Sequence, residues 1–256
     1  MKFTQVRNAT AIIEYANSRF LIDPLFAPKE AYPGLLGTYN DHLNWPTVEL
    51  PMPVDAILED IDAVIVTHTH PDHWDEYAIE AIPKTLQIFA QNEDEATQIR
   101  QAGFNKVEVL GSETLFNGIK LSKTSGQHGS DEAMAMIGKV LGEVSGVVFS
   151  HPTEKTAYLA GDTLWNQHVE DAIAEHKPEV MILNTGDAVS PFGSIIMGKQ
   201  DTLKAHQFRP NSMIIATHME SVNHATLTRT ELNDFIDENN ISDFVLVPED
   251  GETCQL

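Results

Sequence analysis

THTHPDH, at residues 67–73, directly follows the apolar run AVIV at residues 63–66. The stretch places three imidazoles and a carboxylate just after a predicted strand, and borderline divalent metals such as zinc prefer these ligands. Side chains two apart on an extended segment point the same way, so His68 and His70 can hold one ion together. Pro71 keeps His70 extended and turns the chain. Asp72 and His73 are therefore aimed elsewhere, which indicates a second ion.

A surface histidine tract that binds nothing is the alternative interpretation of this stretch. Against it stands the position of the candidate ligands. They follow the carboxyl end of a predicted strand, where α/β proteins build their sites. We therefore favour the metal site.

Composition narrows the class of protein. The chain has 256 residues, 42% of them hydrophobic, which fits one large domain or two small ones. No apolar run approaches the ~20 residues needed to cross a bilayer, and the first residues lack a signal-peptide pattern. The single cysteine, Cys254, excludes an intrachain disulfide and thiolate zinc sites. We expect a cytoplasmic protein whose metal ligands are histidine and carboxylate.

The charge balance bears on partners. The formal charge is −22, from 38 acidic against 16 basic residues. A phosphate backbone is held by clustered lysine and arginine, and no such cluster occurs here. We expect a small-molecule substrate, with neither nucleic acid nor membrane as a partner. A homo-oligomer is compatible with the sequence.

The order of predicted elements indicates the fold. Residues 3–22 are typical of two or three strands with a turn at 16–18. Residues 24–54 form a long loop that is either a substrate lid or a packed structural segment. Strands and helices alternate from residue 55 onward, which predicts two mixed sheets with helices outside. Later strands are predicted at 62–66, 86–89, 106–110, 119–124, 144–150, 156–160, 180–183, 213–216 and 244–247, and helices at 75–82, 92–102, 165–176 and 228–239.

Three further polar side chains follow predicted strands. His128 comes after the strand at 119–124, Asp162 after the strand at 156–160, and His218 after the strand that ends at Thr217. Each alone is most often a capping or surface residue. The same design recurs in four separated segments, however, and this recurrence favours one shared metal site.

These residues resemble the metallo-β-lactamase superfamily of dinuclear metallohydrolases. The resemblance covers nearly the whole chain, because the opening strands and FLIDP at residues 20–24 also match. Trp74-Asp75 after the motif, together with Asp23-Pro24, resembles the ascorbate-6-phosphate-lactonase-like branch. The implied fold is a single α/β domain over residues 1–256, a four-layer αββα sandwich of two mixed β-sheets flanked by helices.

The resemblance also implies a ligand set. One ion would be held by His68, His70 and His128, and the other by Asp72, His73 and His218, with Asp162 bridging the two. Asp23 and Asp75 would orient ligand histidines through the second ring nitrogen. The simpler interpretation of these two is a turn aspartate and a helix-start aspartate.

Such a site implies a hydrolase. Two divalent ions, zinc by expectation and manganese or iron as alternatives, lower the pKa of a shared water from 15.7 to about 7. The resulting hydroxide would attack an ester-like bond of a small molecule, a lactone or a phosphoester. Asp72 and Asp162 would be catalytic by orienting it. His224 would donate a proton or contact substrate, unless it is an exposed loop histidine.

Neighbouring residues have weaker assignments. The stretch 184–199 could wall the pocket, and Lys199 could meet an anionic substrate, although a solvated lysine is commoner. Trp74 and Trp165 lie beside ligand segments, where buried packing explains an aromatic ring equally well. The alternative functions are a nuclease-type phosphodiesterase, which the acidic balance disfavours, and a di-iron redox or sensing protein on the same scaffold.

Overall fold

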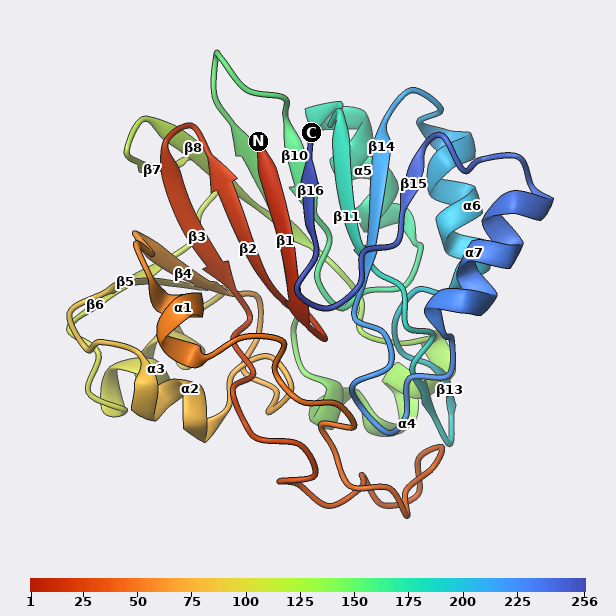
Figure 1. The fold of residues 1–256 in the computed structure, drawn as a ribbon, viewed down its shortest axis with the longest axis horizontal. Helices are drawn as coiled ribbons and strands as arrows, with labels where there is room; N and C mark the ends of the chain where they lie inside the picture. The colour runs from red at the N-terminus through yellow and green to blue at the C-terminus, as the bar shows by residue number, and fades with distance from the viewer.

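Two seven-stranded sheets lie face to face in the computed structural model, which describes residues 1–256 (Figure 1). In spatial order the first sheet consists of β16 (Thr253–Gln255), β1 (Lys2–Arg7), β2 (Thr10–Tyr15), β3 (Ser18–Ile22), β4 (Ala63–Val66), β5 (Gln87–Ala90) and β6 (Lys106–Val109). The second consists of β15 (Val245–Leu246), β14 (Met213–Thr217), β11 (Val180–Asn184), β10 (Ala157–Leu159), β9 (Ser145–Ser150), β8 (Ile119–Ser125) and β7 (Thr114–Phe116).

Each sheet is mixed in the same way. From β16 to β3 neighbouring strands are antiparallel, and from β3 to β6 they are parallel. In the second sheet, β7 to β10 are antiparallel and β10 to β15 are parallel. A separate two-stranded ribbon consists of β12 (Val189–Ser190) and β13 (Gly193–Ser194).

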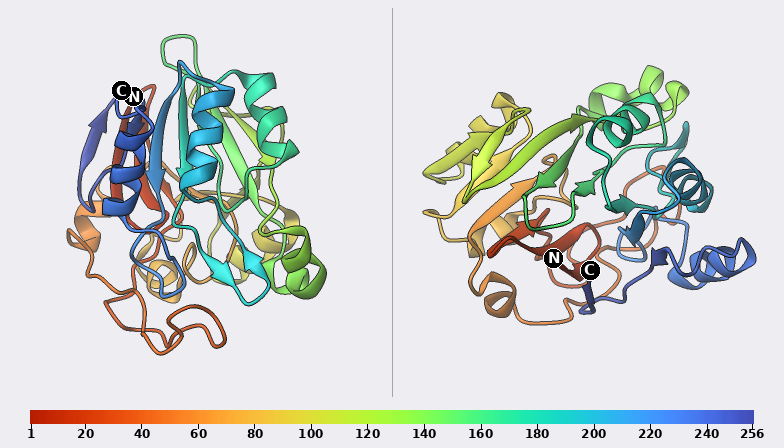
Figure 2. Two further views of the ribbon diagram at one scale, coloured as in Figure 1. Left: turned by 90° about the vertical axis from the view of Figure 1, so that its right-hand side faces the viewer. Right: turned by 90° about the horizontal axis from the view of Figure 1, so that it is seen from above.

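Helices cover the outer faces of the sandwich (Figure 2). On the first sheet lie α1 (Val54–Leu58), α2 (Glu76–Ala81) and α3 (Glu93–Gln101). On the second sheet lie α5 (Gln167–His176), α6 (Lys199–Phe208) and α7 (Arg229–Glu238). The remaining helix, α4 (Asp131–Leu141), packs beside the β12–β13 ribbon at one end of the sandwich.

Alternating apolar residues of both sheets form the central core. Phe20 of β3 meets Phe149 of β9 with ring centroids 5.3 Å apart, and both side chains are fully buried. Burying one such ring contributes about 1.5–3 kcal/mol. Separate apolar clusters lie between each sheet and its helices. The four-layer αββα arrangement predicted from the sequence is therefore confirmed.

The predicted elements agree with the structure to within a few residues, but some were missed. These are the three helices α1, α4 and α6, the short strands β7 and β16, and the β12–β13 ribbon. The long loop after β3 is tied down by the buried Arg7, whose guanidinium donates to the carbonyls of Leu25, Ala27 and Val48. None of the helices is long and apolar enough to cross a membrane.

Candidate metal centre

Ligand candidates gather where β4, β8, β10 and β14 end. These strands run in the same direction toward the end of the sandwich that carries α4 and the loop over residues 28–53 (Figure 1). The seven side chains fall into two groups, within each of which one ligand atom per residue lies within 4.8 Å of the others. We name them the triple-histidine group, His68, His70 and His128, and the carboxylate group, Asp72, His73, Asp162 and His218.

Asp162 lies between the two groups. Its Oδ2 is 3.1 Å from His73 Nε2 and 3.6 Å from His218 Nε2, both in the carboxylate group. The same oxygen is 3.7 Å from His128 Nε2 and 4.0 Å from His68 Nε2 in the triple-histidine group. The other oxygen, Oδ1, accepts a 2.6 Å hydrogen bond from the Asn184 amide. One carboxylate oxygen is thus committed to Asn184 and the other faces both groups.

Hydrogen bonds determine which ring nitrogen of each of three histidines faces the site. His70 Nε2 donates to the Val140 carbonyl at 3.0 Å, and His128 Nδ1 donates to the Ile195 carbonyl at 2.9 Å. His73 Nδ1 donates to Asp23 Oδ2 at 2.9 Å. Because a neutral imidazole has one N–H, each of these rings, once neutral, presents a lone pair on its inward nitrogen. Converging lone pairs with a carboxylate between them fit divalent cations.

Asp23 organises the carboxylate group from behind. It follows β3, and its two oxygens accept hydrogen bonds from the Thr67 backbone N–H and hydroxyl, both at 2.7 Å, as well as from His73. A carboxylate on the far nitrogen fixes ring orientation and raises the basicity of the ring. This is the geometry expected for Asp23.

The same expectation for Asp75 is wrong. Asp75 caps α2 by accepting from the Ala78 N–H, and it also accepts from the N–H groups of Phe26 and Ala27. It contacts no ligand histidine because its carboxylate is turned toward the start of the helix and the loop after β3. Asp75 is the helix-start aspartate of the simpler interpretation.

Two asparagines were not identified as site residues. Asn8, in the β1–β2 turn, donates to the Asp72 carbonyl at 3.1 Å, and its carbonyl accepts from the His218 backbone N–H at 3.1 Å. Asn184, at the end of β11, donates to Asp162. Neither belongs to the histidine pattern. The only available signal was a polar residue at a turn or strand end, which is common throughout proteins.

The two groups differ in the pKa shifts of their side chains. Burial lowers the pKa of His128 to about 4, and burial and neighbouring imidazoles lower the pKa of His68. In the carboxylate group, burial opposes protonation of His73, but Asp162, Asp72 and Asp23 together raise its pKa well above the usual value. The surrounding histidines in turn hold the pKa of Asp162 well below its ordinary range, against the effect of burial. Burial thus keeps the rings of His68 and His128 neutral, whereas the carboxylate group combines a histidine of raised pKa with an aspartate of lowered pKa.

A cavity of about 440 Å³ opens onto both groups. His70, Asp72, His128, Asp162 and His224 form its polar end. The other walls are mostly apolar and come from the long loop, α4 and the segments around β12–β13; they include Leu35, Leu36, Trp45, Ile137, Phe192 and Val222. No lysine or arginine lines it. The cavity therefore suits a neutral, largely apolar molecule.

His224 is buried rather than an exposed loop histidine. Its side chain lines the cavity, and its Nδ1 has no hydrogen-bond partner. Burial lowers its pKa, which keeps the ring neutral near pH 7. The position fits the proton-transfer role expected from the sequence, which stays a prediction.

Three other assignments concern residues away from the cavity. Lys199 is exposed at the start of α6, lies over the Phe235 ring of α7 at 5.6 Å and does not line the cavity, so it is the solvated lysine that the sequence favoured. Trp74 packs on Phe104 and Trp165 on Phe208. Packing explains both tryptophans.

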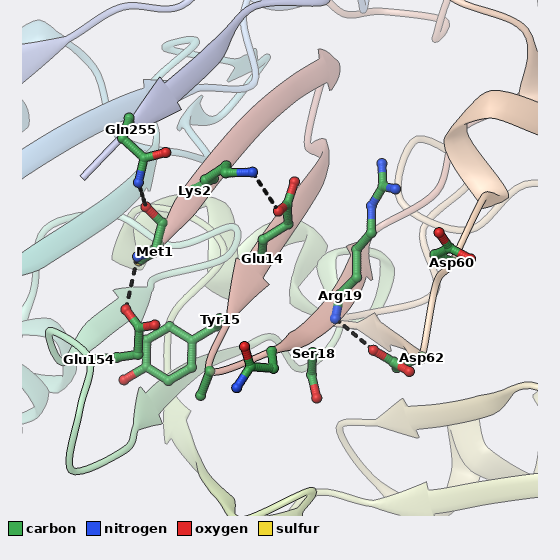
Figure 3. A pocket seen from close by; sticks show the side chains of 12 residues that line it. Met1, Lys2, Glu14, Tyr15, Ser18, Arg19, Asp60, Asp62, Glu154 and Gln255 are labelled. Atoms are coloured by element: carbon green, nitrogen blue, oxygen red, sulfur yellow. Dashed lines mark hydrogen bonds and ion pairs between the residues drawn. The ribbon is translucent and has the colours of Figure 1, made fainter.

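A second hollow, of about 580 Å³, lies at the opposite end of the first strands (Figure 3). Two ion pairs lie in it, Lys2 with Glu14 at 2.9 Å and the N-terminal ammonium of Met1 with Glu154 at 2.8 Å, and the Arg19 backbone N–H donates to Asp62 at 2.9 Å. It contains no histidine and none of the residues of the two groups. It is a polar surface groove.

A model of the beta-lactamase superfamily domain matches residues 18–219. The chain belongs to the beta-lactamase superfamily. Within the superfamily, UPF0173 protein YddR of Bacillus subtilis (strain 168) is 47% identical over 254 residues, which cover 99% of each chain. The predicted superfamily is confirmed. The resemblance to the lactonase-like branch stays a prediction.

Solved structures of the superfamily agree with the fold. The isothiocyanate hydrolase from Delia radicum gut bacteria has a TM-score of 0.97 at 49% identity, covering 100% of this chain and 99% of that chain. A possible metal-dependent hydrolase from Veillonella parvula DSM 2008 has a TM-score of 0.98 at 44% identity, with the same coverage. The metallo-beta-lactamase fold protein YhfI from Bacillus subtilis shares the fold at 12% identity, with a TM-score of 0.66 over 99% of both chains.

Proposed function

We propose that this metal-dependent hydrolase acts on a small, neutral, apolar electrophile, and that an isothiocyanate is its substrate class. The observation that carries the proposal is the cavity, whose apolar walls lead to four of the seven candidate ligands, in both groups, without any lysine or arginine side chain. Support also comes from the 49% identity to the isothiocyanate hydrolase. A neutral cumulated group on an aliphatic or aromatic side chain matches such a cavity.

The two groups would hold two divalent ions, one per group, with Asp162 facing both. When bound, such ions lower the pKa of a water to about 7 and polarise the substrate, so that a nucleophile is available at neutral pH. The protein's own contribution is to fix the ligand rings through Asp23 and the carbonyls of Val140 and Ile195. These contacts also select the tautomer of each ring.

The reaction needs a bound side chain and a carried proton. Water adds across the N=C bond of R–N=C=S to give the thiocarbamic acid R–NH–C(=O)–SH. The bond between nitrogen and the central carbon then breaks as the second proton moves from sulfur to nitrogen, and the products are the amine R–NH₂ and carbonyl sulfide. Trp45, Ile137 and Phe192 exclude water and hold the R group. Asp72 orients the attacking water, while His224, kept neutral by burial, accepts one of its protons and delivers it to the leaving nitrogen.

A lactone is the second candidate substrate. Its carbonyl carbon is attacked in the same way, and an aliphatic lactone is neutral and apolar enough for the cavity. A phosphoester is disfavoured because no lysine or arginine lines the cavity to pair with its charge. The same absence disfavours a nuclease-type phosphodiesterase.

The test is a substrate panel with metal analysis. We expect about two equivalents of metal per chain and release of amine from alkyl and aryl isothiocyanates, lost on chelation and restored by Zn²⁺ or Mn²⁺. Hydrolysis of an aliphatic lactone alone would replace the substrate class and keep the reaction type. Inactivity of the metal-loaded protein on both classes, together with reversible one-electron reduction of bound iron, would contradict the hydrolase and favour the redox alternative.

A further inference from the structure

The last turn of α4 borders both the cavity and the triple-histidine group. Ile137, Val140 and Leu141 all line the cavity. Leu141 also packs, with Ala133, on a small apolar cluster that includes Ala188 and Ile195. The Val140 side chain remains 73% exposed at the rim. An apolar molecule that entered the cavity would cover apolar surface of this turn and so stabilise it.

The backbone of the same turn contacts a candidate ligand. The Val140 carbonyl, one of the carbonyls that a helix leaves free at its C-terminus, accepts from His70 Nε2 at 3.0 Å. This hydrogen bond leaves His70 Nδ1 as the inward nitrogen, 3.0 Å from His68 Nε2. His70 is also the only histidine of the two groups that is not fully buried. The orientation of its ring therefore depends on where α4 ends.

The end of α4 depends in turn on one glycine. The helix is interrupted at Ile137, where φ is −130° and ψ is 15°. It closes at Gly142, with φ 67° and ψ −166°, where the N–H donates to the Gly138 carbonyl. That backbone conformation is essentially restricted to glycine. A Cβ at Gly142 would meet no neighbouring atom, so a substitution there acts through the backbone alone.

We propose that the last turn of α4 is a positioning element for a metal ion in the triple-histidine group, and that apolar substrate in the cavity strengthens metal binding through it. The second half of this inference rests on the proposed apolar substrate. The first half depends only on the contact between Val140 and His70. Linkage makes the effect reciprocal, since metal in this group must strengthen apolar binding by the same factor.

The first test compares two glycine variants of the full-length protein. Zn²⁺ is titrated into metal-free protein in competition with a chromophoric chelator. We expect Gly142→Ala to weaken one of the two equivalents by about 10–100-fold and to leave the other unchanged. Gly118→Ala is the matched control. Its φ is also positive, at 81°, its Cβ meets nothing, and it lies in the β7–β8 turn away from the groups. Unchanged affinity in Gly142→Ala, or equal weakening in Gly118→Ala, would overturn the positioning role.

A second variant covers the case in which Gly142→Ala fails to fold. Gly138→Ala adds a Cβ that makes only ordinary contacts and favours continuous helix through the interruption at Ile137. We expect the same single equivalent to weaken, because the Val140 carbonyl moves away from His70. A folded Gly138→Ala protein with both equivalents at wild-type affinity would count against the inference.

The second test measures linkage with a probe that is not a substrate. Toluene is neutral, apolar and cannot ligate zinc. In the wild type, saturating toluene should increase, by about fivefold or more, the affinity for the Zn²⁺ equivalent that Gly142→Ala weakens. In Gly142→Ala this tightening should be lost. No change in the wild type would overturn the linkage. Because neither test measures hydrolysis, failure to cleave isothiocyanates would leave both results interpretable.

Discussion

The two ligand groups lie side by side but are held in different ways. The carboxylate group carries Asp72 and Asp162, and the side chain of Asp23 fixes its His73. The triple-histidine group carries no carboxylate of its own, and its outer bonds go to backbone carbonyls of segments that line the cavity. From this difference we infer different roles. The carboxylate group would bind its ion firmly, whereas the ligand orientation in the triple-histidine group would depend on the segments that line the cavity.

The most severe way to break this comparison is to remove the residue that both groups share. Asp162→Ala should lower kcat/KM by about 10³-fold or more, because several kcal/mol of stabilisation at both ions is lost together. Zinc content measured on the purified variant should fall well below two equivalents. Asn184→Ala is the milder comparison, since it removes only the donor to the other oxygen of Asp162. Full zinc content in Asp162→Ala would show that the two groups do not share this residue.

Breaking one group should leave the other intact. His70→Ala should lose one equivalent of zinc and keep the second, with activity falling by about 10²–10³-fold as one source of substrate polarisation disappears. Metal titration of the variant counts the equivalents. Loss of both ions would mean that the groups bind metal only as a unit.

A smaller effect should follow from altering the support of the carboxylate group. Asp23→Asn replaces the acceptor behind His73 and should weaken one zinc equivalent by about 10–100-fold. Asp75→Asn is the control, because it is also a buried aspartate but touches no ligand. It should lower the free energy of unfolding by about 1 kcal/mol and leave zinc affinity unchanged. Equal zinc affinities in the two variants would argue against the role of Asp23.

The smallest effect is one of pH, and it sharpens the comparison. In the metal-free protein the raised pKa of His73 means that an ion entering the carboxylate group must displace a proton. Zinc affinity there should rise as pH increases above the ordinary histidine pKa of about 6.5 and should level off only above the raised pKa of His73. In the triple-histidine group burial lowers the pKa of His68 and lowers that of His128 to about 4, so these two rings release no proton and the affinity should rise less steeply with pH. Calorimetry in buffers of different ionisation enthalpy counts the released protons, and equal proton release from both groups would contradict the assignment.

The same shift has a consequence for stability. A pKa raised by folding contributes stability that is fully present below the unfolded value of about 6.5 and is lost as pH rises through the folded value. His73 should therefore make the metal-free protein less stable as pH rises above about 6.5. Chemical denaturation across that range measures the change, and the metal-loaded protein serves as the reference.

The sequence predicted the fold and the candidate ligands because both depend on short, regular patterns. An apolar run followed directly by histidine or aspartate predicts a strand and places the polar residue at the end of a sheet, as with His218 after β14. Asp75 was misassigned because a carboxylate beside a ligand segment can equally well cap the next helix. Local sequence does not distinguish the two.

The sequence predicted only part of the cavity walls. The expected wall segment at 184–199 supplies Ala188, Phe192 and Ile195, but the wall that α4 supplies was not predicted. The helix α4 was missed because an internal glycine and an irregular residue, Ile137, interrupt its pattern, and because Val140 faces the rim instead of a core. Leu36 and Phe192 lie far apart in the chain, and only the tertiary structure brings them to the same cavity. Substrate preference is a property of these walls, whereas the expected lactone or phosphoester came from the family resemblance; the substrate stays a prediction.

The two mixed sheets, which follow the same order of antiparallel and parallel strands, have one more consequence. His68, His70, Asp72 and His73 follow a strand of the first sheet, whereas His128, Asp162 and His218 follow strands of the second. Each ligand group therefore draws side chains from both sheets. An ion in either group would link the two sheets of the sandwich. Its removal would loosen the contact between the sheets at the end of the molecule where the cavity lies.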